Sequence, residues 1–379
     1  MARILIVLLA TACGSDGRVC TDGGARSDGG AGADGAISRD TSPRDVGSRD
    51  TNDVCETVRA VAEPVAATLL FQVDTSNSMN CLASNPACLT GDPTPAPDDS
   101  RWDVFTRELE GALADLPGDT RVGLMRFPQA ERACTDDILT AEVRPIGESR
   151  SELLATIGSI TPDGLGTPTH DGVAFGLTRL ASLGAERPFL VLATDGNSSV
   201  CLGCDADCGF DSPEPLARDA DDLVTRVRGA AESGIPTFVI GVPGSQGFRD
   251  VLSRIASAAG TGRAGCADLG PVYCHYDLTD PGLDFGGALR GALAEIGDAV
   301  LSCEYDIPDN PEGAFDPMRV NVQIESGGDE ETIPRDPSRA TGWDYTSDGN
   351  RIELFGPACE RVRNADAIDI LFGCPTLLI

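Results

Sequence analysis

The stretch Leu69–Met79 (LLFQVDTSNSM) places one carboxylate and two hydroxyls at alternate positions, namely Asp74, Ser76 and Ser78. The apolar residues from Leu69 to Val73 have the length and branching of a buried strand. If that strand belongs to a parallel sheet, its last side chains reach the crevice at the carboxyl edge, where open α/β sheets bind ligands. Three oxygen donors without nitrogen or sulfur suit a hard cation such as Mg²⁺. Short Asp/Ser strings also occur in ordinary loops, so this pattern alone leaves that alternative open.

Two later segments make this pattern resemble the metal-ion-dependent adhesion site of von Willebrand factor A domains. The segment 164–169 (GLGTPT) resembles the loop that carries the family's metal-binding threonine, here Thr167. The segment 189–196 (FLVLATDG) resembles the later strand that ends in Thr-Asp-Gly, with Asp195 as the second carboxylate. The resemblance covers residues 66–301. The metal site that it implies comprises five residues: Asp74, Ser76, Ser78, Thr167 and Asp195.

In the site that this resemblance implies, hydroxyls contact the metal, and the two carboxylates act through water or as hydrogen-bond acceptors. Neutral ligands leave Mg²⁺ (or Mn²⁺ or Ca²⁺) short of negative charge, so an acidic group from a partner can complete the octahedron. We therefore expect a binding protein and no enzyme, with a protein or surface polymer as partner. One alternative is an envelope scaffold whose metal only stabilises the fold. A hydrolase is a more distant alternative, because the two histidines, His170 and His275, lie in no recognisable nucleophile arrangement.

Strand and helix patterns alternate across the region of the resemblance, which predicts a doubly wound, mostly parallel α/β sheet. Ser100 is expected to cap a helix, with Asp103 in the capping-box position. The expected strands are 69–73, 121–127, 189–194, 236–241 and 272–278. The expected helices are 100–116, 151–160, 171–183, 215–233, 248–259 and 283–301.

The chain is expected to divide into four parts. Residues 1–13 resemble an export signal with a lipobox, 14–53 a disordered linker, 54–301 the A-like domain, and 302–379 a small β-rich module. Lipidation of Cys13 would anchor the chain in the membrane, although ordinary signal cleavage is an alternative. No later apolar run reaches the ~18 residues that span a membrane.

Fourteen cysteines favour disulfides in an oxidising compartment. The loop 201–208 has metal-like cysteine spacing, but an export signal argues for oxidation. Candidate disulfide cysteines are Cys81, Cys88, Cys201, Cys204, Cys208, Cys266, Cys274, Cys303, Cys359 and Cys374. We therefore expect a cell-envelope protein, periplasmic or at the outer membrane and cell surface, or else a secreted one.

The chain is strongly acidic, with 29 Lys and Arg against 60 Asp and Glu and a net charge of -31. Such a surface repels nucleic acid and anionic lipid, which excludes both as partners apart from a lipid anchor. The same acidity suits cationic partners, and it also keeps an exported protein soluble.

Overall fold

The computed structural model describes residues 58–379 except 86, 89–97, 130–133, 197–212, 302, 309–315 and 348. The expectations for Cys13, the linker 14–53 and the loop cysteines Cys201, Cys204 and Cys208 lie outside the described residues. Among the described residues, no helix is both long enough and apolar enough to cross a membrane.

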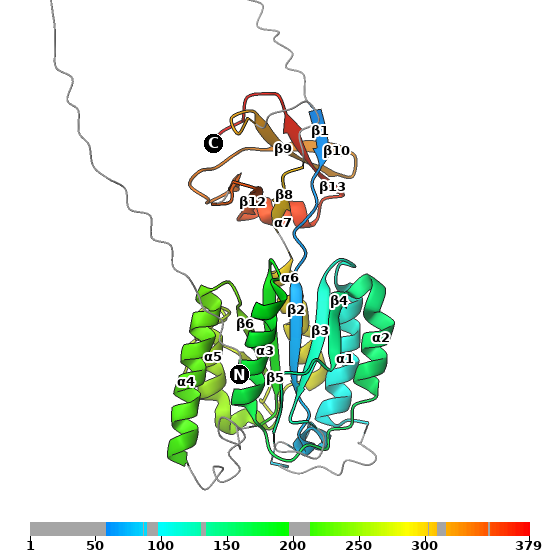
Figure 1. The fold of residues 1–379 in the computed structure, drawn as a ribbon, viewed down its shortest axis with the longest axis vertical. Helices are drawn as coiled ribbons and strands as arrows, with labels where there is room; N and C mark the ends of the chain where they lie inside the picture. The colour runs from blue at the N-terminus through cyan, green and yellow to red at the C-terminus, as the bar shows by residue number, and fades with distance from the viewer. Residues whose placement is uncertain are drawn as a thin grey trace, which may run out of the picture. The chain divides into compact units, whose positions relative to one another are not determined.

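A six-stranded sheet with the order β4-β3-β2-β5-β6-β7 forms the centre of the larger part of the fold (Figure 1). All neighbouring strands pair in parallel except β3 and β4, which are antiparallel. The strands are β2 (Thr68–Asp74), β3 (Arg121–Phe127), β4 (Ala141–Pro145), β5 (Pro188–Thr194), β6 (Thr237–Gly241) and β7 (Tyr276–Asp277). The expected doubly wound, mostly parallel sheet is therefore confirmed.

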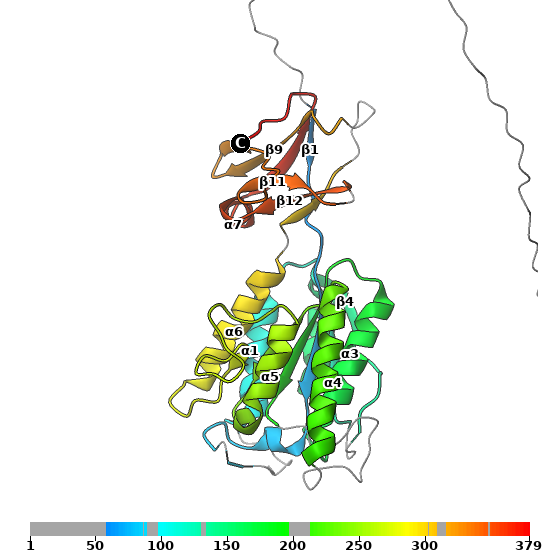
Figure 2. The ribbon, with the colours of Figure 1, turned by 90° about the vertical axis from the view of Figure 1, so that its left-hand side faces the viewer.

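Helices cover both faces of this sheet. The helices α1 (Arg101–Asp115), α2 (Ile146–Gly158) and α6 (Phe285–Val300) pack on one face. The helices α3 (Thr169–Leu183), α4 (Pro213–Glu232) and α5 (Arg249–Ala258) pack on the other, and Figure 2 shows α4 and α5 in front of the sheet. Two short 3₁₀ helices, η1 (Asn77–Asn80) and η2 (Ser245–Phe248), follow β2 and β6.

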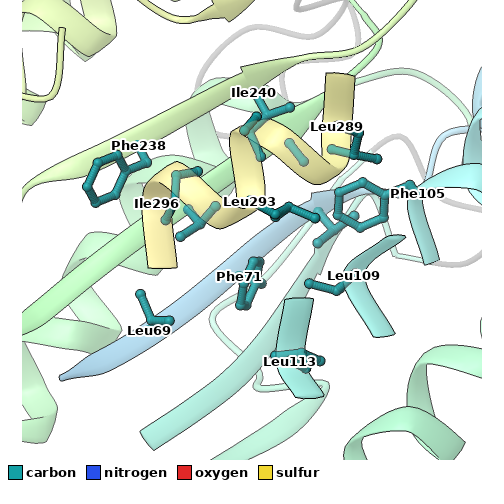
Figure 3. Packing of buried hydrophobic residues seen from close by; sticks show 14 of the residues in the cluster. Leu69, Phe71, Phe105, Leu109, Leu113, Phe238, Ile240, Leu289, Leu293 and Ile296 are labelled. Atoms are coloured by element: carbon teal, nitrogen blue, oxygen red, sulfur yellow. The ribbon is translucent and has the colours of Figure 1, made fainter. Parts of the chain in front are cut away.

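The central strand β2 is buried along its whole length, which explains its continuous apolar run. Leu69 and Phe71 point to the face covered by α1 and α6, where they meet Phe105 and Leu293 (Figure 3). Leu70 points to the opposite core under α3 and α4. Burying each such side chain contributes roughly 1.5–3 kcal/mol, so the two cores hold the end of β2 rigidly.

Two local expectations are resolved in different ways. The Ser100 hydroxyl accepts a hydrogen bond from the backbone amide of Asp103 at 3.1 Å, which confirms Ser100 as the N-cap of α1. The strand expected over 272–278 is limited to β7, because a disulfide between Cys266 and Cys274 closes a loop over the residues just before it.

The C-terminal module consists of two small antiparallel sheets and one helix around a core of its own. One sheet has the order β1-β13-β9-β10, in which β1 is Val58–Val61, and the other has the order β11-β12-β8. Their elements are β8 (Glu304–Asp306), β9 (Val320–Ser326), β10 (Asp329–Ile333), β11 (Gly342–Tyr345), β12 (Arg351–Phe355), β13 (Ala367–Phe372) and α7 (Pro357–Arg363). A disulfide between Cys303, just before β8, and Cys359 in α7 links the start of this region to its helix.

The first strand, β1 (Val58–Val61), belongs to the C-terminal module although it precedes the A-like sheet in sequence. It pairs antiparallel with β13, from Val58 opposite Phe372 to Val61 opposite Asp369. The range 54–301 expected for the A-like domain thus contains β1, a strand of the module's four-stranded sheet. The chain enters the module, leaves it to build the six-stranded sheet, and returns.

Candidate functional site

Asp74 lies at the carboxyl end of β2 and is 0% exposed. Its Oδ1 accepts a hydrogen bond from the backbone amide of Ser76 at 2.9 Å, and its Oδ2 accepts one from the hydroxyl of Thr194 at 2.6 Å. Thr194 is the last residue of β5, which is the parallel neighbour of β2. The sheet itself therefore brings these two strand ends together.

The two serines after Asp74 turn toward the end of β5. The hydroxyls of Ser76 and Ser78 lie 2.9 Å apart. The Ser78 hydroxyl also donates to Oδ1 of Asp195 at 2.9 Å across 117 positions of sequence. The predicted proximity of Ser78 and Asp195 is thus present in the structure.

The loop with Thr167 completes the group. Ser76 forms a parallel bridge with Gly164, and the amide of Asn77 donates to the carbonyl of Gly164 at 3.0 Å. A side chain at Gly164 would collide with Pro128, so glycine allows this close approach. Thr167 is buried, and its Oγ1 lies 3.1 Å from where a Cβ on Gly196 would stand. All five predicted residues therefore gather at one edge of the sheet.

Burial and neighbouring charges shift the pKa values of the two carboxyls. Burial, and after it the negative charge of Asp195, raises the pKa of Asp74 to about 7. Burial also raises the pKa of Asp195, against the opposing effect of the Arg101 guanidinium. Within the described residues, Asp74 accepts only from neutral donors and forms no ion pair.

Sequence reasoning missed Arg101, the first residue of α1. Its Nη1 lies 2.5 Å from Oδ2 of Asp195, and the two side chains are 1% and 0% exposed. A signal was present, because a cation in the first turn of a helix opposes the helix dipole and so needs a local reason.

The donor set fits a hard divalent cation. Hydroxyl and carboxylate oxygens are the ligands that Mg²⁺, Mn²⁺ and Ca²⁺ accept, and Asp74 is a buried carboxylate without a cationic partner among the described residues. The described residues hold no cluster of three or more His, Cys, Asp and Glu side chains suited to a metal. A metal here would therefore depend on Ser76, Ser78 and Thr167.

The two histidines are not among the five residues of the predicted metal site. His170 is buried in the first turn of α3, and burial lowers its pKa. His275 is buried beside Gly241, and burial lowers its pKa to about 4.

The disulfide expectations that fall on described residues hold. Cys81 pairs with Cys88 beside the site, and Cys266–Cys274 and Cys303–Cys359 are the other two pairs described above. Cys374 is also disulfide-bonded, as is Cys134, which was not among the candidates.

Comparisons with known proteins give structural similarities only. No protein-family model matches this sequence, and no curated protein matches it. The chain is similar to the PilB minor pilin from Streptococcus sanguinis, at 17% identity and a TM-score of 0.47 over 63% of this chain and 62% of the pilin. It is also similar to a von Willebrand factor type A protein from Catenulispora acidiphila, at 13% identity and a TM-score of 0.38 over 85% of this chain and 61% of that protein.

A third similarity is to the pilus adhesin SpaC from Lactobacillus rhamnosus GG, at 11% identity and a TM-score of 0.42 over 83% of this chain and 40% of the adhesin. This chain spans less than two thirds of each of these three proteins. At such identities and scores the matches do not establish a function.

The strand order and the direction of each strand decide the architecture instead. The sheet has five parallel strands and one antiparallel edge strand, β4. Numbered by their order in the sequence, its strands lie side by side as 3-2-1-4-5-6. The polar cluster lies at the switch point of this order, between β2 and β5. The fold is von Willebrand A-like. In this A-like domain the cluster lies where such sheets bind ligands.

Proposed function

We propose that the A-like domain binds a divalent cation, Mg²⁺ or in its place Mn²⁺ or Ca²⁺, and through it an acidic group on a protein or surface polymer. The observation that carries this proposal is the convergence of two buried carboxylates and three hydroxyls at one sheet edge, with Asp74 lacking a cationic partner among the described residues. An isolated buried carboxylate is costly, and a cation relieves that cost.

The residues of the site divide into two roles. Ser76, Ser78 and Thr167 offer neutral oxygens as direct ligands, while Asp74 and Asp195 hold the serine loop through hydrogen bonds. When bound, the cation supplies a Lewis-acidic centre that an external carboxylate can complete. Binding requires no covalent step from the chain.

The chemistry of the whole chain supports an exported location. Disulfides persist in oxidising compartments, and three are described here. We propose a cell-envelope protein, with lipidation at Cys13 as its anchor and ligand binding at the cell surface as its role. A net charge of -31 makes a direct attraction to acidic polymers unfavourable, so the metal would have to supply that attraction.

Isothermal titration calorimetry with Mn²⁺ tests the metal site. The variant Asp74→Asn removes one of its carboxylates. Because an acidic surface attracts cations loosely, Asp298→Asn on the exposed side of α6 serves as control, removing one charge elsewhere. We expect one tight site in the wild type and in Asp298→Asn, and its loss in Asp74→Asn. Equal binding by all three proteins would contradict the proposal.

The acidic ligand is tested with a Gly-Glu-Gly peptide with blocked ends, and Gly-Gln-Gly is the control. The relaxation rate of water protons, which bound Mn²⁺ enhances, should change with the Glu peptide alone, because only a carboxylate displaces a metal-bound water. The scaffold alternative predicts that Mn²⁺ raises the melting temperature while neither peptide alters the relaxation.

A further inference from the structure

The position of Arg101 is electrostatically unfavourable for a cation. Its side chain is 1% exposed, and it stands at the N-terminus of α1, the positive end of the helix dipole. Burying a guanidinium there requires specific compensation, since both desolvation and the dipole oppose it.

Hydrogen bonds from the two terminal nitrogens supply that compensation, whereas the buried Nε has no hydrogen-bond partner among the described residues. Nη1 donates to the carbonyl of Ser78 at 3.3 Å, and Nη2 donates to the carbonyls of Asn85 and Cys88, each at 3.1 Å. Gly244, with φ +118°, packs against it so closely that a Cβ there would lie 2.5 Å from Nη1. The guanidinium is therefore held in one position by two loops.

Asp195 is fully engaged as a result. Its Oδ2 pairs with Arg101 and its Oδ1 accepts from Ser78, so both oxygens already have donors. An Asp195 held in this way orients Ser78 and is a poor candidate for direct charge donation to a metal.

We propose that Arg101 is a positioning residue that sets the charge of the metal site and thereby its preference for an acidic ligand. This inference rests on the proposed function. With both carboxyls ionised, as a bound cation would hold them, Asp74 and Asp195 together with Arg101 carry a net charge of -1, so a divalent cation leaves the site at +1. Without Arg101 the carboxylates carry -2, and the same cation leaves it neutral. Arg101 thus weakens metal binding and strengthens binding of an external carboxylate, because like and opposite charges interact strongly in a partly desolvated site.

Four proteins test this charge count: the wild type, Arg101→Gln, Asp195→Asn, and the double variant. Mn²⁺ affinity is measured by titration in the absence of peptide. We expect Arg101→Gln to bind Mn²⁺ at least about tenfold more tightly than the wild type, and Asp195→Asn to bind it more weakly. The double variant restores the net charge of -1, so its affinity should return toward that of the wild type.

The affinity for the acidic peptide should change in the direction opposite to the affinity for Mn²⁺. Arg101→Gln loaded with Mn²⁺ should bind the blocked Gly-Glu-Gly peptide more weakly than the wild type, and Arg101→Lys, which keeps the charge, should lie closer to the wild type. Arg107→Gln is the matched control, since Arg107 lies on the same helix and its exposed side chain pairs with Asp103 and Glu108. It should change neither affinity.

The outcomes separate the two proposals. If the wild type binds no Mn²⁺, the proposed function fails, and this inference fails with it. If the wild type binds Mn²⁺ and the Glu peptide but Arg101→Gln loses both affinities together, Arg101 is only structural and the charge role is wrong. If Arg101→Gln does not fold, the double variant, which has no unpaired Asp195 charge, carries the test: a Mn²⁺ affinity far from wild type overturns the inference.

Discussion

The hydroxyl of Ser78 donates to Oδ1 of Asp195 at 2.9 Å and thereby ties the loop after β2 to the end of β5. Asp195 is buried, so Ser78→Ala leaves one oxygen of a buried carboxylate without a donor. We expect the free energy of unfolding to fall by about 1–3 kcal/mol, measured by urea denaturation without metal. Ser182→Ala, at an exposed helical hydroxyl, should change it by less than about 0.5 kcal/mol. Equal losses in both variants would mean that the Ser78 contact is not formed in solution.

The raised pKa of Asp74 predicts an unusual dependence of stability on pH. The folded carboxyl has a pKa of about 7 against an ordinary 3.8, so between these values the folded state holds a proton that the unfolded state has lost. The stability that this proton contributes is complete below pH 4 and is lost as the pH rises toward 7, by on the order of a few kcal/mol. Divalent cation relieves the ionised carboxylate, so Mn²⁺ should raise the melting temperature more at pH 7.5 than at pH 5.5. Calorimetry checks this trend, and Asp74→Asn should abolish it.

Much of the A-like domain is predictable because its pattern is local. The apolar strands 69–73 and 189–194, each buried on both faces, read as continuous apolar runs, and Asp74 and Asp195 come directly after them. The parallel pairing of these strands then places the two carboxylates at one edge. Asp195 and Thr167 were named from the sequence through the resemblance of their segments to the A-domain metal site.

The features that sequence reasoning missed depend on contacts between distant segments. Arg101 opposes the dipole of its helix, but only the fold places it against Asp195, 94 positions away. The strand β1 is short and half-exposed, so its pattern does not indicate that it pairs with β13 at the other end of the chain. The edge strand β4 was not among the predicted strands for the same reason, because it is short and partly exposed.

The disulfide between Cys81 and Cys88 should affect ligand binding more than its contribution to stability implies. It closes the loop whose carbonyls at Asn85 and Cys88 hold Arg101. Replacing both cysteines by serine should cost about 2–3 kcal/mol of stability and should also weaken Mn²⁺-dependent binding of the Glu peptide.

A second disulfide provides the control for this effect. Cys266–Cys274 closes a loop of nearly the same length, with a sequence separation of 8 against 7, so its removal should cost a similar amount of stability. Peptide binding should survive that change. Equal losses of binding in the two double-serine variants would show that the effect comes from stability alone.

The pairing of β1 with β13 predicts that a change at the N-terminal side of the A-like domain unfolds the C-terminal module. Ala62, just after β1, is 4% exposed in the module core, and its amide donates to the carbonyl of Ile368 at 3.0 Å. Ala62→Asp would bury a charge there without a partner, at a cost of several kcal/mol. Val61→Lys is the matched control, because Val61 is 68% exposed and a lysine there would lie opposite Asp369 without like-charge repulsion.

The two tryptophans of the chain report on the two regions separately, since Trp102 lies in the A-like core and Trp343 in the module core. In a Trp102→Phe background, Ala62→Asp should shift the Trp343 emission to that of an exposed indole, while Val61→Lys leaves it unchanged. In a Trp343→Phe background, the emission of Trp102 should stay that of a buried ring in both variants, because β1 takes no part in the six-stranded sheet. A Trp343 that remains buried in Ala62→Asp would show that the module folds without β1 and that its pairing with β13 is dispensable.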